Sequence, residues 1–392
     1  MHHLLAESIS KITFLSKPTK TFLIIIIETF SIVRGKANYT NLSRYSRISE
    51  KTIRRWFSKK IDFKSINSTL LKHLPSSHTK IGVIDASFIK KAGKFTDGIS
   101  WFWSGCAGTT MKGLEMSLIS IVDVVANTAY AIDCKQTIDQ KGKTRIELYA
   151  DHIESCFEKL RDHRIFHIAA DAFYTKKTFI DRVKNNGFDM VGKLRKDANL
   201  KWLYSGSKAK YGRPKKYDGK VKFNDFNKLN LEEIKDGISI YSAEVYAVSM
   251  SRNVKLVLLY NNENDAYALL FSTDLNLTGQ SIVKYYKARF QIEFFIRDAK
   301  QYTGLMDSQS RSSQAINTHL NISATTLNAL KIEDCFTKNS FLESTISIAT
   351  WKCIKFNKHY ISGILSMLEI SKSDEKYDAV YREYSDYGAI AA

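Results

Sequence analysis

The stretch Lys80-Ile81-Gly82-Val83-Ile84-Asp85 is a short apolar run that ends on an acid. A second run of the same kind, Ile165-Phe166-His167-Ile168-Ala169-Ala170-Asp171, follows later in the chain. Short apolar runs of this length are typical of strands buried in a sheet. We therefore expect Asp85 and Asp171 each to lie where a strand meets a loop. If the two strands are parallel neighbours, both carboxylates project at the same edge of the sheet.

The sequence around these runs alternates between strand and helix patterns, which predicts an α/β fold with a mixed sheet flanked by helices. Residues 193–278 interrupt the pattern, because they are basic at first and then β-like, and we interpret them as an inserted β-rich subdomain. The other expected elements are strands at 118–125, 129–133 and through Met190 and Val191, insertion strands at 238–245, 254–260 and 267–272, and helices at 144–160, 175–185, 279–302, 312–331 and 339–370.

The composition of the 392 residues is that of an ordinary globular protein, with 44% apolar and 25% charged residues. The length suggests two or three domains. The 59 basic residues exceed the 40 acidic ones by 19, which indicates a polyanionic partner, most simply nucleic acid. The excess is concentrated in residues 1–80 and 193–222, so two separate basic surfaces are expected. The second surface includes Arg213, Lys215 and Lys216.

Several other classes of protein are disfavoured. The apolar run from Phe22 to Ile27 is too short to span a membrane, and no secretory signal is visible, so a cytoplasmic location is expected. No glycine-rich phosphate loop appears, so ATP is not expected. The cysteines form no CxxC pair, which argues against a disulfide scaffold and a structural zinc site. The five cysteines are Cys106, Cys134, Cys156, Cys335 and Cys353. His152, Cys156, His163 and His167 are more simply explained as structural residues than as zinc ligands.

The N-terminal residues 1–78 resemble a helix-turn-helix. One short helix is expected at 40–46, and Ser49 is a suitable N-cap for a second helix at 50–59. Lys51, Arg54 and Arg55 lie on the helix that would enter a major groove. The alternative is a basic, solvated helix in a small bundle.

The expected helix at 279–302 carries Tyr286, Arg289, Glu293 and Lys300 with the spacing Y-x2-R-x3-E-x6-K. In a continuous helix these side chains share an arc of about 60°, apart from the apolar stripe that would face the core. A carboxylate between two cations suits a site in which Glu293 holds a metal ion and its neighbours hold phosphates. The alternative is a salt-bridged helix edge.

Asp85, Asp171 and Glu293 together would supply hard oxygen ligands, which suit Mg²⁺ or Mn²⁺ rather than zinc. Two such ions about 3.5–4 Å apart can activate a nucleophile and stabilise the leaving oxygen of a phosphodiester. Other acids could compete for this role, and Asp123, inside an expected strand, is the strongest rival. The remaining rivals are Asp97, Asp133 and Asp189.

With these residues the sequence resembles the DDE transposases of bacterial insertion sequences, specifically the insertion-sequence-four group with the YREK signature. Tyr286, Arg289, Glu293 and Lys300 match that signature completely. The resemblance covers roughly residues 80–325. The surroundings that also match are Asp85-Ala86-Ser87-Phe88, Ala170-Asp171-Ala172-Phe173-Tyr174 and Gly212-Arg213-Pro214-Lys215-Lys216-Tyr217.

The resemblance implies an RNase H-like catalytic domain with Asp85 on the first strand, Asp171 after the fourth and Glu293 on a late helix. Tyr286, Arg289 and Lys300 would contact DNA near the cut. Such enzymes cut at terminal inverted repeats and join the 3′-hydroxyl to target DNA, here as a homodimer associated with the bacterial nucleoid. A base flipped out of the duplex is often held by an aromatic residue, for which Trp202 is a weak candidate.

This interpretation divides the chain into five segments. They are an N-terminal helical DNA-binding domain (1–78), a first part of the catalytic domain (79–192), the basic β-rich insertion (193–278), the last catalytic part with the Glu293 helix (279–330) and a C-terminal helical region with a tail (331–392). Two alternatives stay open: an RNase H-like nuclease without strand transfer, and a non-catalytic helix-turn-helix protein that binds DNA.

Overall fold

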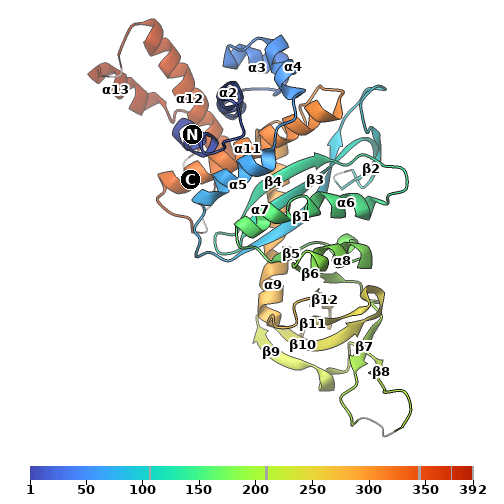
Figure 1. Ribbon diagram of the computed structural model, residues 1–392. Helices are drawn as coiled ribbons and strands as arrows, with labels where there is room; N and C mark the ends of the chain where they lie inside the picture. Colours follow the sequence, from blue (N-terminus) through green and yellow to red (C-terminus); the bar gives the residue numbers. More distant parts are fainter. Residues whose placement is uncertain (106, 208–210, 343–345, 372, 391–392) are drawn as a thin grey trace.

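A computed structural model describes residues 1–105, 107–207, 211–342, 346–371 and 373–390. Cys106 and the lysines at 208 and 210 of the expected basic surface therefore lie outside the described residues. The chain forms one mixed sheet with helices on both of its faces (Figure 1). The strands are β1 (Lys80–Lys90), β2 (Ser100–Ser104), β3 (Thr109–Asp123), β4 (Thr128–Gln136), β5 (His167–Ala169), β6 (Asp189–Leu194), β7 (Leu200–Leu203), β8 (Tyr217–Lys220), β9 (Asn230–Lys235), β10 (Ile238–Ala247), β11 (Arg252–Asn261) and β12 (Tyr267–Ser272).

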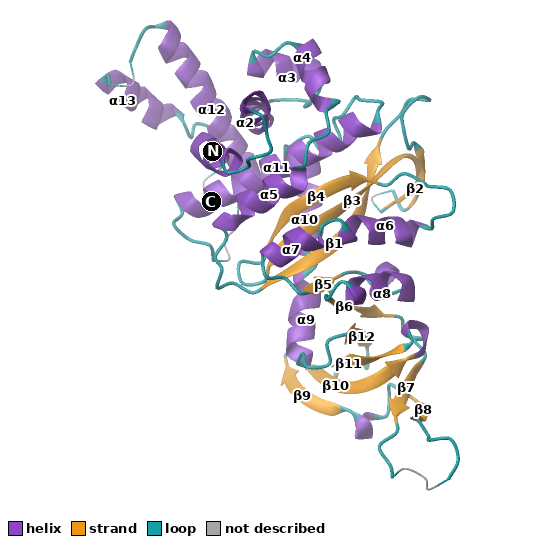
Figure 2. Cartoon of the chain, in the orientation of Figure 1, coloured by secondary structure: helices purple, strands orange, loops and turns teal. Residues whose placement is uncertain are grey.

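Helices surround the sheet and build most of the N-terminal and C-terminal regions (Figure 2). They are α1 (His2–Ser10), α2 (Lys17–Ile32), α3 (Tyr39–Ser46), α4 (Glu50–Phe57), α5 (Phe63–Leu70), α6 (Arg145–Glu154), α7 (Phe157–Asp162), α8 (Lys177–Asn185), α9 (Gly279–Ala288), α10 (Gln291–Tyr302), α11 (Ser313–Thr337), α12 (Ile348–Met367) and α13 (Glu375–Tyr384).

Five strands at one end of the sheet have the order β4-β3-β1-β5-β6, and β2 pairs with residues 109–113 of β3. β1 is antiparallel to β3 and parallel to β5, and β5 is parallel to β6. Three antiparallel strands followed by two parallel ones form an RNase H-like sheet, which confirms the expected fold class. The parallel pairing of β1 with β5 also places Asp85 and Asp171 toward the same end of the sheet, as the two apolar runs predicted.

β1 is longer than the sequence indicated. It continues past Asp85 to Lys90 and pairs with β3 along its whole length, so that Asp85 lies opposite Leu118 in the middle of the strand. The prediction that Asp85 marks the end of a strand is therefore wrong. Asp171 lies as predicted, two residues after the end of β5.

The two faces of the sheet have different cores. On one face, Leu118 of β3 packs in a cluster with Phe295 of α10 and Leu327 of α11. On the other face, Ile119 of β3 packs in a cluster with Tyr149 of α6. Because neighbouring residues of a strand point to opposite faces, Asp85, opposite Leu118, faces α10.

The insertion extends the sheet. β12 is antiparallel to β6, and β11, β10 and β7 continue the order outward from it. The expected insertion strands at 238–245, 254–260 and 267–272 correspond to β10, β11 and β12. Trp202 of β7 is 8% exposed and belongs to the core, so its ring is not available to a flipped base.

The N-terminal helices α2 and α5 pack on α11 and β4. The apolar residues of α2 are buried, and the Thr326 hydroxyl of α11 donates to the backbone oxygen of Ile27 over 3.4 Å. α3 and α4 form where they were expected, and the side chain of Ser49 caps α4 by accepting from the Thr52 N–H. Within the described part of the chain, none of the helices has the length and apolar character needed to cross a membrane.

Two expected helices are interrupted. The helix predicted at 144–160 is divided into α6 and α7, and the one predicted at 279–302 is divided into α9 and α10. At the second break, the N–H groups of Ile292 and Glu293 donate to the backbone oxygens three residues earlier, at Arg289 and Phe290. Because the helix is interrupted by this tighter turn, the arc of about 60° expected for Tyr286, Arg289, Glu293 and Lys300 on a continuous helix does not apply.

Candidate active site

Asp85 and Asp171 are half-buried, whereas Glu293 is exposed. Burial raises the pKa of the Asp85 carboxyl group to about 7; the Ala86 N–H and the Arg289 guanidinium oppose this, while the carboxylates of Asp171 and Glu293 add to it. The shift therefore reports that Asp171, Glu293 and Arg289 lie close enough to act on Asp85 electrostatically. Residues far apart in the sequence are brought to one place on the α10 side of β1.

Asp171 is held by local structure. It caps the short 3₁₀ turn Ala172–Tyr174, and its Oδ1 accepts from the Phe173 N–H at 2.9 Å. Capping uses one carboxylate oxygen and leaves lone pairs on the other, so the side chain is oriented without being saturated. Phe173 itself is 45% exposed beside the site.

Glu293 lies in the first turn of α10, where a negative charge is stabilised by the helix dipole. Its side chain is 45% exposed, and its Oε1 pairs with Nη2 of Arg289 at 2.9 Å. Arg289 and Glu293 are four residues apart on either side of the break between α9 and α10, and they form an ion pair.

Arg289 is buried, which is unusual for an arginine. Its guanidinium lies 4.6 Å from the ring centre of Phe290 and 5.6 Å from that of Tyr286. Among the described residues no partner accepts from its Nε. Burial raises the pKa of Tyr286, and the charges of Arg289, Asp171 and Glu293 act on it as well, which places this tyrosine at the same site.

Lys300 connects α10 to β1. Its Nζ donates to Oγ of Ser87 at 2.9 Å and to the backbone oxygen of Phe88 at 2.8 Å. Ser87 and Phe88 lie two and three residues after Asp85 in β1. The bonds from Lys300 therefore hold the strand of Asp85 against the helix of Glu293. The four residues of the motif are therefore all near the site, although they do not share one helix edge.

The donor set fits hard divalent cations. Three carboxylates offer oxygen ligands, and Asp85 carries a raised pKa because it is buried near two other acids. In the described part of the chain, the one group of three metal-capable side chains whose ligand atoms all lie within 4.8 Å is a different one, Asp133, His152 and Cys156.

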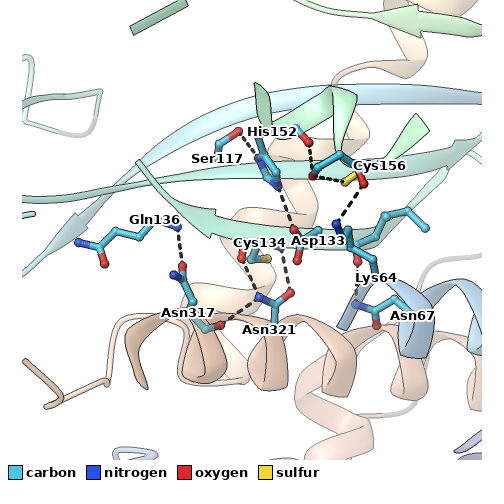
Figure 3. Close-up of polar contacts among 12 residues, drawn as sticks. Lys64, Asn67, Ser117, Asp133, Cys134, Gln136, His152, Cys156, Asn317 and Asn321 are labelled. Atoms are coloured by element: carbon cyan, nitrogen blue, oxygen red, sulfur yellow. Dashed lines mark hydrogen bonds and ion pairs between the residues drawn. The ribbon is translucent and has the colours of Figure 1, made fainter. Parts of the chain in front are cut away.

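The Asp133 group was not predicted as a set, although Asp133 was considered as a rival ligand and His152 and Cys156 were expected to be structural residues. Figure 3 shows that its members have protein partners: Nδ1 of His152 lies 2.9 Å from Oγ of Ser117, and Nε2 lies 3.2 Å from Oδ2 of Asp133. The other two histidines lie elsewhere, His163 bonded to Ser68 and His167 to Asp274. The pairing of Asp133 with His152 depends on strand register, which the sequence alone does not reveal.

The strongest rival ligand, Asp123, has a structural role. Its Oδ1 accepts from the N–H groups of Val125 and Ala126, each at 3.0 Å, and its Oδ2 lies 2.7 Å from Nδ1 of His78. These contacts hold the turn between β3 and β4, at the far end of the strand pair from Lys90. Asp123 is therefore not part of the candidate site.

The two expected basic surfaces lie at opposite ends of the molecule in Figure 1. On α4, Lys51 and Arg55 are exposed, whereas Arg54 pairs with Glu50 at 2.8 Å through its Nε. In the loop between β7 and β8, Arg213, Lys215 and Lys216 are exposed, and Lys215 pairs with Asp218 at 2.9 Å. The candidate site lies between these two surfaces.

Comparison with known protein families agrees with the fold and the position of the site. The model of the transposase DDE domain matches residues 76–329, which is more than half of the chain. A search of the curated proteins found no match.

The chain belongs to the family of transposases with a DDE domain. It is a protein of DNA transposition, and members of this family act with divalent metal ions. The matched residues include Asp85, Asp171 and Glu293, and begin two residues before the end of the N-terminal region expected at 1–78.

Proposed function

We propose that the protein is the transposase of an insertion sequence of the insertion-sequence-four group, with Tyr286, Arg289, Glu293 and Lys300 as its YREK signature. It would bind terminal inverted repeats, cut the DNA and join the freed 3′-hydroxyl to target DNA. The observation that carries the proposal is the match of the transposase DDE domain to residues 76–329. It is supported by the ion pair of Arg289 with Glu293 and by the bond from Lys300 to Ser87, which join the α10 residues to the strand of Asp85.

Asp85, Asp171 and Glu293 would hold two divalent ions, Mg²⁺ or Mn²⁺. When bound, these ions supply an activated oxygen nucleophile and neutralise charge on the leaving oxygen. Arg289 pairs with Glu293 and lies against Tyr286, and we propose that both residues contact the phosphate at the cut. Lys300 keeps Glu293 at a fixed distance from Asp85 through its bonds to β1.

The two basic surfaces support contacts to DNA on both sides of the site. Lys51, Arg54 and Arg55 would read the terminal repeats, with Arg54 exchanging Glu50 for a phosphate, and Arg213, Lys215 and Lys216 would hold the DNA backbone. A homodimer would bring two DNA ends together, and the protein would act in the bacterial cytoplasm at the nucleoid. The proposed segments 1–78, 79–192, 193–278, 279–330 and 331–392 describe this division of roles.

The test compares Glu293→Gln with Glu158→Gln, a change at an exposed surface acid. The substrate is a duplex carrying the inverted repeats that flank the coding sequence. We expect Glu293→Gln to bind this DNA and to lose cleavage by about three orders of magnitude or more, because an uncharged amide is a poor ligand for Mg²⁺. Glu158→Gln should cleave like the unchanged protein.

Cleavage should require Mg²⁺ or Mn²⁺ and should stop in Ca²⁺, whose longer ligand distances misplace the reacting oxygens. Cleavage in a chelator, or normal cleavage by Glu293→Gln, would overturn the proposal. Cleavage without joining to target DNA would identify a nuclease, and binding without cleavage in any metal would identify a non-catalytic DNA-binding protein.

A further inference from the structure

Two exposed tryptophans lie side by side on the edge strand β2. Trp101 and Trp103 are 68% and 65% exposed, whereas Phe102 between them is 4% exposed and lies under the Arg145 guanidinium at 4.8 Å. Phe102 therefore anchors the strand while the two indoles face solvent on the other side. An exposed pair of large aromatic side chains is unusual on a protein surface and indicates a binding surface.

The strand register places this pair on the catalytic face of the sheet. Trp101 lies opposite Lys112 of β3 and Trp103 opposite Thr110, and Asp85 of β1 lies opposite Leu118 of the same strand. Directly opposed residues, and alternate residues of one strand, share a face. The indoles therefore face the same side as Asp85.

The distance from the indoles to the site follows from the same register. Leu118 is six residues from Lys112 and eight from Thr110 along β3. At about 3.4 Å per residue this is roughly 20–27 Å, which equals roughly six to eight base-pair steps of DNA. DNA held at Asp85 could therefore reach the indoles without leaving the protein surface.

The charge around the pair matches a nucleic acid. Residues 86–114 contain four lysines but a single acid, Asp97, whose Oδ2 accepts from the Ser313 N–H at 2.9 Å. Lys112 lies directly opposite Trp101 on the same face, whereas Lys90 alternates with Ile89 and faces the other side of the sheet. Lysine is depleted at the centre of protein–protein interfaces, whereas lysines beside aromatic rings are typical of surfaces that bind unpaired nucleotides. The pattern thus favours DNA over a second copy of the chain.

We propose that Trp101, Trp103 and Lys112, here called the indole platform, bind unpaired bases of the DNA strand that flanks the cleavage site. The indoles stack on base faces and Lys112 contacts the adjacent phosphate. Stacking requires bases that are out of the duplex, and it is tolerant of sequence because every base has an aromatic face. This inference rests on the proposed function and adds a binding surface for flanking DNA to it.

The experiment measures DNA affinity in the Glu293→Gln background, so that no cleavage occurs. Two substrates share the terminal repeat: one is fully paired, and the other carries eight unpaired nucleotides on the flanking side. We expect Trp101→Ala/Trp103→Ala to weaken binding of the second substrate about tenfold or more and to change binding of the first less than twofold. Trp101→Phe/Trp103→Phe should retain most of the affinity, and Tyr360→Ala, at another exposed aromatic residue, should have no effect.

Lys112→Ala should reduce the slope of log affinity against log salt concentration for the unpaired substrate by about one, which corresponds to one lost phosphate contact. The proposal would be overturned if the double alanine variant bound both substrates as tightly as its parent does. It would also be overturned if the variant lost the same affinity for the paired and the unpaired substrate. A loss of self-association with unchanged DNA affinity would instead identify an interface between copies. If the proposed function fails because Glu293→Gln cleaves normally, the preference for unpaired DNA can still be measured in Ca²⁺, so the two failures are distinguishable.

Discussion

Two groups of metal-capable side chains lie on opposite faces of the same sheet. Asp85, with Asp171 and Glu293 near it, faces α10, whereas Asp133 and His152 meet beneath α6. The second group is the more compact, since its ligand atoms lie within 4.8 Å of one another. By distance alone, the second group would be chosen as the metal site.

The partners of the side chains reverse that choice. Both ring nitrogens of His152 have hydrogen-bond partners within the protein, and burial lowers the pKa of this histidine, so it is held neutral. Asp85, in contrast, is a half-buried acid close to two other acids, and Arg289 nearby has an Nε without a partner among the described residues. A cation would reduce the electrostatic repulsion among Asp85, Asp171 and Glu293. At Asp133 and His152 it would instead displace existing hydrogen bonds.

The largest expected effect separates the two groups by cleavage. Asp171→Asn should reduce cleavage by about three orders of magnitude or more, because the amide can still cap the Ala172–Tyr174 turn but is a poor metal ligand. Asp133→Asn should stay within about threefold of the unchanged protein, since an amide can also bond to His152. Gel-based cleavage rates at saturating Mg²⁺ measure both. Similar losses in the two variants would remove the distinction between the groups.

The next effect concerns stability and pH. The pKa of Asp85 is raised from 3.8 to about 7 in the folded protein, so between these values the folded state holds a proton that the unfolded state has lost. The free energy of unfolding should therefore fall as the pH rises from about 4 to about 7 and change little above that. Asp85→Asn should remove this loss of stability. The free energy of unfolding of the variant should be higher than that of the parent by roughly 2–4 kcal/mol at pH 8 and equal to it near pH 4.

Urea unfolding in a chelator measures this difference, and adding Mg²⁺ at pH 8 provides the control. Magnesium should stabilise the unchanged protein and should have little effect on Asp85→Asn. A parent protein whose stability does not depend on pH in this range would contradict the account of Asp85.

The smallest effect belongs to the second group. Cys156 is fully buried, and burial raises the pKa of its thiol well above the usual range. Cys156→Ser should lower the free energy of unfolding by about 1–2 kcal/mol, since a hydroxyl is harder to bury than a thiol, and should leave cleavage unchanged. Adding Zn²⁺ should not raise the melting temperature of either protein. A clear rise with zinc that Cys156→Ser abolishes would make the second group a metal site.

Much of the fold could be predicted from local patterns. Ser49 caps α4 as its sequence context indicated, and the insertion strands lie where alternating apolar residues placed them. The extent of β1 could not be predicted, because Asp85 and Ser87 are polar on the face that meets α10 and so interrupt the apolar run. Polar residues on a strand face that packs against a helix therefore resemble the end of a strand in the sequence.

The break between α9 and α10 could not be predicted for a different reason. The break falls at Arg289 and Phe290, and no glycine or proline lies between Gly279 and Gly304, so the sequence contains no signal for a helix break. The tight turn coincides with the burial of Arg289 beside Glu293, which is a tertiary effect. The four motif residues still have contacts around the break, since Arg289 pairs with Glu293 and lies against Tyr286, and Lys300 bonds to Ser87 of β1. Their assignment to an active site stays a prediction.

The packing of the N-terminal helices on α11 has a consequence for how the protein is made. Asn67 of α5 accepts from the side chain of Asn328 at 3.1 Å, and Ile27 of α2 accepts from Thr326. α2 therefore meets α11 only after more than three hundred residues have left the ribosome. α5 can pack earlier on β4, where the side chain of Asn67 donates to the backbone oxygen of Ile132 at 3.0 Å. Glu293 also precedes α11 in the chain. A translation product that stops before Glu293 would lack both this docking surface and a candidate metal ligand, so an incomplete chain would be unable to cut DNA.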